Sequence, residues 1–85
     1  METHYTFGGE SSIDEILDEI LIPAALDLRK DDIIYLYDSR LNKFFDDGGG
    51  NQGHDQTPPL KVDSITYIFD GDNKLIGKRI DLDEV

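Results

Sequence analysis

The segment from Ser12 to Leu21 constrains the fold most, because its apolar side chains recur at the spacing of a helix. One face of that helix is apolar and carries Ile13, Ile16, Leu17, Ile20 and Leu21. The opposite face carries the acids Asp14, Glu15, Asp18 and Glu19. Ser12 and Glu15 have the spacing of a capping box, in which each side chain bonds an unpaired amide at the helix start. Because Pro23 disfavours helical geometry at Ile22, we expect the helix to end or kink there.

The rest of the chain predicts strands. The expected strands are His4–Phe7, Ile33–Tyr37, Leu41–Phe45, Val62–Phe69 and Leu75–Leu82. The first alternates like a short edge strand, and the second is apolar on both faces, as in a central strand covered on both sides. The turn sequence of residues 70–73 joins the last two strands as a hairpin. We therefore predict an α+β fold with one N-terminal amphipathic helix packed on a four- to five-stranded antiparallel sheet, in the order β-α-β-β-β-β.

The length of 85 residues predicts a single domain, residues 1–85, with one modest core. Residues 46–59 contain no apolar side chain other than proline and are rich in glycine, so we expect a flexible Gly/Pro-rich loop or a functional one. Residues 1–7 lack the pattern of a signal peptide, and no apolar run approaches the roughly 18 residues that span a bilayer. With no cysteine in the chain, these features predict a soluble, cytoplasmic protein.

Negative charge is concentrated at the N-terminal end. The formal net charge is −11, and the first 28 residues contain seven acids and no Lys or Arg. Such a field repels nucleic acid and anionic membranes and favours a basic protein partner, although acidity can also serve solubility alone. Asp14 and Asp18, like Glu15 and Glu19, have the spacing at which like charges on a helix repel. Local stability does not explain them, so we expect Lys at positions 18 and 19 to leave the fold intact and to harm binding.

The expected partner-binding residues combine this acidic face with nearby aromatic and acidic side chains. They are Asp14, Glu15, Asp18, Glu19, Tyr35, Tyr37, Asp46 and Asp47. The two tyrosines, if exposed at a strand end, supply the aromatic anchors that dominate many interfaces. The two loop acids extend the same negative surface.

Catalytic and metal motifs are weak throughout the chain. There is no cysteine, and the two histidines, His4 and His54, have no serine in a recognisable nucleophile setting. The glycines of residues 48–53 lack the Lys and Ser or Thr of a P-loop. The acids of residues 70–81 lack the glycine and the final glutamate of an EF-hand. We therefore predict no enzyme activity, no catalytic residue, no metal and no cofactor.

In size, acidity and lack of cysteine, and through segments 12–21 and 46–55, the chain resembles the small immunity proteins of bacterial nuclease toxins, in colicin-type and contact-dependent inhibition systems. That resemblance implies an inhibitor that occludes the cationic surface of a cognate toxin. Two other functions stay open at this stage. One is a phage-type nucleic-acid mimic that blocks a restriction or CRISPR complex, and the other is a structural or calcium-binding accessory domain. The sequence leaves the oligomeric state undetermined.

Overall fold

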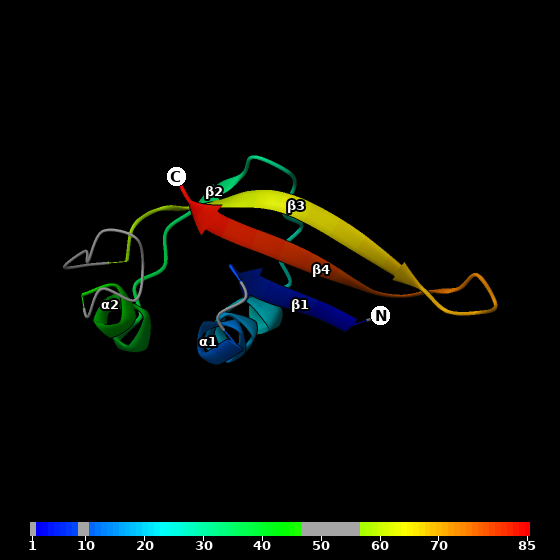
Figure 1. Ribbon diagram of the computed structural model, residues 1–85, viewed down its shortest axis with the longest axis horizontal. Helices are drawn as coiled ribbons and strands as arrows, with labels where there is room; N and C mark the ends of the chain where they lie inside the picture. Colours follow the sequence, from blue (N-terminus) through cyan, green and yellow to red (C-terminus); the bar gives the residue numbers. More distant parts are fainter. Residues whose placement is uncertain (1, 9–10, 47–56) are drawn as a thin grey trace.

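Two helices and four strands make up the part of the chain that the computed structural model describes, residues 2–8, 11–46 and 57–85 (Figure 1). In chain order the elements are β1 (Glu2–Phe7), α1 (Ser11–Leu21), the 3-10 turn η1 (Ile22–Ala24), β2 (Ile33–Ile34), α2 (Ser39–Asp46), β3 (Leu60–Phe69) and β4 (Leu75–Glu84). The α+β class is confirmed. The prediction of a single helix is wrong, because α2 is a second one.

The four strands form one sheet in the order β1-β4-β3-β2. β4 is antiparallel to β3, and β3 to β2, but β1 runs parallel to β4. The prediction of a wholly antiparallel sheet is therefore wrong at β1. Glu2 pairs with Gly77 and Phe7 with Leu82, and strands so far apart in the chain leave no local signal of their relative direction. The predicted edge position of the first strand is confirmed.

α1 forms as its apolar periodicity predicts. Ile13, Leu17 and Leu21, four residues apart, are all buried. The helix ends at Leu21, and η1 with Pro23 follows, which confirms the predicted stop. The capping box is wrong in detail. The helix begins at Ser11, so Ser12 lies inside the first turn, where its side chain is past the N-cap position.

α2 replaces the predicted turn and strand over residues 38–45. Leu41 and Phe45 are both buried, and their spacing of four residues is that of one helix face. The apolar residues of this segment are equally compatible with a strand. Asp38 favours the helix because it acts as the N-cap residue of α2. Its carboxylate accepts the Arg40 amide at 2.8 Å, and its carbonyl accepts the Asn42 amide at 2.9 Å. The turn chemistry of Asp38 is therefore that of a helix start.

β2 is a short edge strand, and the predicted central strand over residues 33–37 is wrong. Only Ile33 and Ile34 pair, with Lys61 and Leu60 of β3. Beyond them the chain stays irregular as far as α2, and its side chains still alternate. Ile34 is half-buried against the core, whereas Ile33 is exposed because no described element covers that face.

The core lies between the two helices and the body of the sheet. Phe7 of β1 meets Phe44 and Phe45 of α2 edge-to-face, with ring centroids 6.4 and 5.6 Å apart. The β3–β4 hairpin extends well past the other strands (Figure 1), and the long axis measures 46 Å against 22 and 21 Å for the other two. We call the outer part of the hairpin, residues 66–79, the arm. Its base admits β1 closely, since a Cβ on Gly77 would lie 2.9 Å from the Glu2 carbonyl oxygen.

Candidate functional site

Two acids of the expected binding face are used inside the fold. Asp18 accepts the backbone amide of Tyr5 at 2.6 Å, and Asp14 accepts that of Phe7 at 2.9 Å. The match is geometric, because four residues of helix advance about 6 Å and two residues of strand about 6.6 Å. Acids one turn apart on α1 therefore reach alternate amides of the antiparallel neighbour β1. They therefore pair two backbone amides on the outer edge of β1.

His4 joins the same contact on the surface. Its Nδ1 lies 3.0 Å from Asp18 Oδ2, and its Nε2 lies 3.5 Å from a carboxylate oxygen of Glu2. The hydrogen bond with Asp18 raises the pKa of His4 above its ordinary value of 6.5, although partial burial opposes the shift. Asp18 thus serves a backbone amide and an imidazole at once. Its half-buried carboxylate is committed before any partner arrives.

The remaining two acids of α1 differ from each other. Glu15 is exposed. Glu19 accepts Arg40 Nη1 at 2.8 Å, and Arg40 Nη2 also donates to Asp38 at 3.1 Å. The hydrogen bond from Arg40 holds the pKa of Asp38 below its ordinary value. This bridge ties α1 to the start of α2.

Both predicted tyrosines lie on the surface between β2 and α2. Tyr35 is 63% exposed and Tyr37 is 86% exposed. Together with Ile33, which is 52% exposed, they point away from the core at every second residue. Two exposed acids, Asp31 and Asp32, precede this stripe. We call these five residues, Asp31, Asp32, Ile33, Tyr35 and Tyr37, the β2 surface.

Asp31 and Asp32 were missed as site residues. Asp31 has a left-handed backbone with φ of 72°, and its amide bonds the Val62 carbonyl at 2.9 Å. Asp32 accepts the Val62 amide through its backbone and the Arg29 amide through its side chain. These bonds fix the turn on β3. The available signal was the pair of acids directly before the apolar segment of residues 33–37.

The structure brings some predicted residues together and separates others. Tyr37 directly precedes Asp38, and Arg40 bonds both Asp38 and Glu19, so one tyrosine and one acid of α1 lie near the start of α2. Asp46 lies at the other end of that eight-residue helix, about 12 Å away along its axis. Asp47 and most of the predicted loop, residues 47–56, lie outside the described residues.

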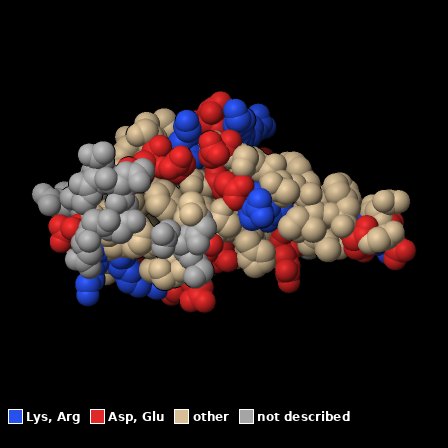
Figure 2. All heavy atoms as spheres, viewed as in Figure 1, with Lys and Arg blue, Asp and Glu red and all other residues tan. Residues whose placement is uncertain are grey.

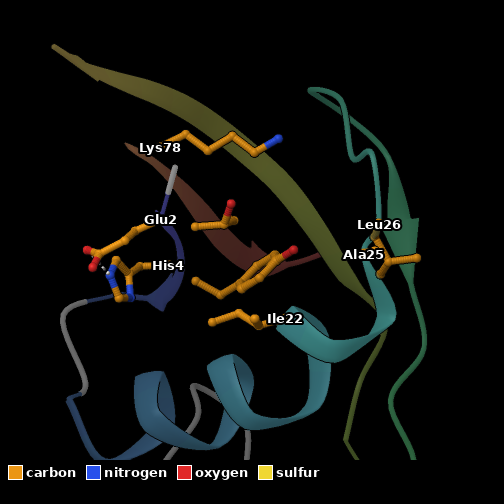
Figure 3. Close-up of a pocket in the computed structure, with 8 residues that line it drawn as sticks. Glu2, His4, Ile22, Ala25, Leu26 and Lys78 are labelled. Carbon is orange, nitrogen blue, oxygen red and sulfur yellow. Dashed lines mark ion pairs between the residues drawn. The ribbon is translucent and has the colours of Figure 1, made fainter. Parts of the chain in front are cut away.

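A hollow of about 520 Å³ opens between β1, η1 and the base of the arm (Figure 3). Ile22 and Leu26 form an apolar wall, and Lys78 and the pair of His4 and Glu2 supply the charge. Tyr5 also lines this hollow.

Asp81 holds three strands together. It accepts hydrogen bonds from Thr6 of β1, from Ser64 of β3 at 2.7 Å and from Arg79 at 3.1 Å. Burial favours the neutral acid, but these donors hold the pKa of Asp81 below its ordinary value. The same side chain borders a second hollow of about 250 Å³ with Asp63 and Asp83. In the part of the chain that the structure describes, no three acidic or histidine side chains are arranged to hold a metal ion.

Comparison of the chain with protein-family models, with curated proteins and with solved structures found no match. Among residues 2–8, 11–46 and 57–85, neither helix has the length and apolar character needed to cross a bilayer.

Proposed function

We propose that this chain is an acidic protein-binding inhibitor, an immunity protein that neutralises a basic nuclease toxin by occluding its cationic surface. The observation that supports it is the β2 surface, where two highly exposed tyrosines follow two exposed aspartates in a chain of net charge −11. Exposed tyrosines are the anchors on which tight interfaces depend, and surrounding carboxylates steer a basic partner toward them. Inhibition of this kind needs no catalytic group.

The proposed contact is centred on Tyr35 and Tyr37. Glu15 and Glu19 are the acids of α1 that remain on the outside of the molecule, and Glu19 keeps its bond to Arg40. A cationic toxin surface competes for Glu19 against that single exposed bridge, which costs little to break. Asp14 and Asp18 contribute to the field without leaving β1.

A nucleic-acid mimic is the weaker candidate. It needs a row of free carboxylates spaced like phosphates, whereas two of the four acids of α1 bond the backbone of β1. The arm also carries three basic and two acidic side chains, which a mimic of a polyanion would have no reason to display.

The test is co-expression with the product of the open reading frame directly upstream of this gene in its native genome, where the proposal expects the toxin gene. We expect the wild-type chain to restore growth and the purified pair to bind. Tyr35→Ala with Tyr37→Ala should weaken affinity by about 30-fold or more, since truncating one anchor typically costs about 2 kcal/mol. Tyr67→Ala, which removes an exposed tyrosine from the arm, is the matched control and should bind like wild type. Absence of protection, or equal loss in the control, would refute the proposal.

A further inference from the structure

The hollow between β1, η1 and the base of the arm has the size of a small-molecule site. Its volume of about 520 Å³ lies within the range of about 300–1,000 Å³ that ligand pockets occupy. Ile22 and Leu26, which form its apolar wall, are 44% and 39% exposed. The left-handed backbone of Ala25, with φ of 51°, turns the chain between η1 and Leu26. The wall is therefore held by a defined turn and is open to a ligand.

The polar groups of the hollow project from one face of the sheet. Thr3 of β1 is the register partner of Lys78 of β4, so the two side chains stand side by side on the same face. Tyr5, two residues after Thr3, projects from that face as well. All three residues line the hollow. A ligand packed on the apolar wall therefore faces two hydroxyls and one ammonium.

Tyr5 is buried, yet its hydroxyl has no hydrogen bond to another described residue. Tyr5 is 2% exposed, and its side chain takes no part in the bond that its amide donates to Asp18. No fully buried side-chain atom of the described residues lacks a partner, so this hydroxyl is the part of Tyr5 that reaches the open hollow. Burial and the charge of Asp18 raise the pKa of Tyr5 above its ordinary value of 10.0, which keeps the hydroxyl protonated. It is thus a donor available to a ligand.

Lys78 is half-buried and unpaired among the described residues. The cations of the ion pairs in this part of the chain are His4, Arg40 and Arg79. In Figure 3 the ammonium end of Lys78 points away from Glu2 and His4, which pair with each other. Figure 2 shows mostly uncharged atoms along the arm, with charges gathered at its tip. In a chain with 19 acids and 8 basic residues, an unpaired lysine beside an apolar wall indicates an anion from outside.

The charge of the chain limits what this anion can be. A net charge of −11 repels a ligand more strongly as the negative charge of the ligand rises. One ammonium offsets one negative charge, so a carboxylate fits better than a phosphate monoester, which carries about −1.5 to −2 at pH 7. A cation is disfavoured by Lys78, and Glu2 is already paired with His4. Much of the affinity must then come from apolar area buried against Ile22 and Leu26.

We propose that this hollow binds a small apolar carboxylate. Lys78, Thr3 and Tyr5 donate hydrogen bonds to the carboxylate oxygens, and the bond from the ammonium is the strongest because both groups are charged. Ile22 and Leu26 pack against the hydrocarbon body of the ligand. The site lies at the β1 edge of the sheet, whereas the β2 surface lies at the other edge, so the two sites are independent.

Octanoate is the first probe, and its binding to the whole chain is measured by calorimetry and by NMR shifts of the backbone amides. 1-Octanol has the same hydrocarbon chain without the charge, and octylammonium has the opposite charge. We expect octanoate to shift the amides of Thr3, Lys78 and Leu26 most, and 1-octanol to bind about tenfold more weakly. Octylammonium should not bind in the hollow. Failure of octanoate to bind there, or equal affinity for either of the other two probes, would overturn the proposal.

Two variants with matched controls test the donors. Lys78→Met should lower octanoate affinity by about tenfold or more, because it removes the charge and keeps the unbranched stem. Lys74→Met, on the exposed hairpin turn, should bind like wild type. Tyr5→Phe should leave the melting temperature unchanged and weaken octanoate by about fivefold, because only the free hydroxyl is lost. Tyr67→Phe is its control. Equal loss in Lys74→Met, or a Tyr5→Phe variant that melts lower and binds normally, would refute these roles.

Discussion

At the scale of single residues, Asp14 and Asp18 show how one side chain can look free in the sequence and be committed in the fold. Their spacing of four residues suggests that the two carboxylates repel each other. If repulsion were their only interaction, replacing Asp18 with Lys would not destabilise the protein. Their bonds to Phe7 and Tyr5 change that expectation. Lys at position 18 would leave the Tyr5 amide without its acceptor and the His4 ring beside a like charge. The expected tolerance of the Asp18→Lys and Glu19→Lys pair is therefore withdrawn.

The first residue-scale prediction concerns His4. Asp18→Asn should lower the pKa of His4 toward 6.5, measured by NMR titration, because the main cause of its raised pKa is removed. A raised folded pKa adds stability below the unfolded value, and that stability is lost as pH rises through the folded value. The variant should therefore lose more stability in acid, below about pH 6, than above pH 8. Glu15→Gln is the control, and an unmoved His4 titration would contradict the assignment.

At the scale of elements, the sequence predicted the structure correctly where a residue pattern was compatible with only one type of element. Leu17 and its neighbours fit only a helix, and the turn at residues 70–73 fits only a hairpin, so α1 and the β3–β4 pair were predicted. Leu41 and Phe45 fit two structures, and the choice depended on Asp38 acting as a cap. Tyr35 and Tyr37 are exposed because no described element covers their side of the sheet. That depends on how the whole sheet assembles, so the sequence of the segment alone could not show it.

Removal of the α2 cap is the prediction at this scale. Asp38→Ala should destabilise the protein by about 1 kcal/mol, as loss of an N-cap carboxylate usually does. For a domain of this size that corresponds to a melting temperature about 4–8 °C lower. Ser39→Ala, one residue on, is the control and should have little effect. Equal melting of Asp38→Ala and wild type would mean that α2 gains nothing from its cap.

At the scale of the whole molecule, charge separates an acidic body from an arm with a slight excess of basic residues. Raising salt from about 0.05 to 0.5 M should therefore slow association with a basic toxin, because it screens steering. Stopped-flow binding measures the association rate at each salt concentration. An association rate that does not change with salt would contradict this role of the charge.

The pairing of Glu2–Phe7 with Gly77–Leu82 also sets the order in which the molecule can be completed. During synthesis α1 is made well before β4, the strand that pairs with its neighbour β1. Until residue 82 has left the ribosome, β1 has no complete partner strand. The apolar face of α1 then has no complete sheet to pack against. Contacts of such long range fold slowly, since the whole loop between them must close first. A nascent chain halted after the hairpin turn therefore exposes the Ile and Leu residues of α1 to whatever chaperone or protease finds them.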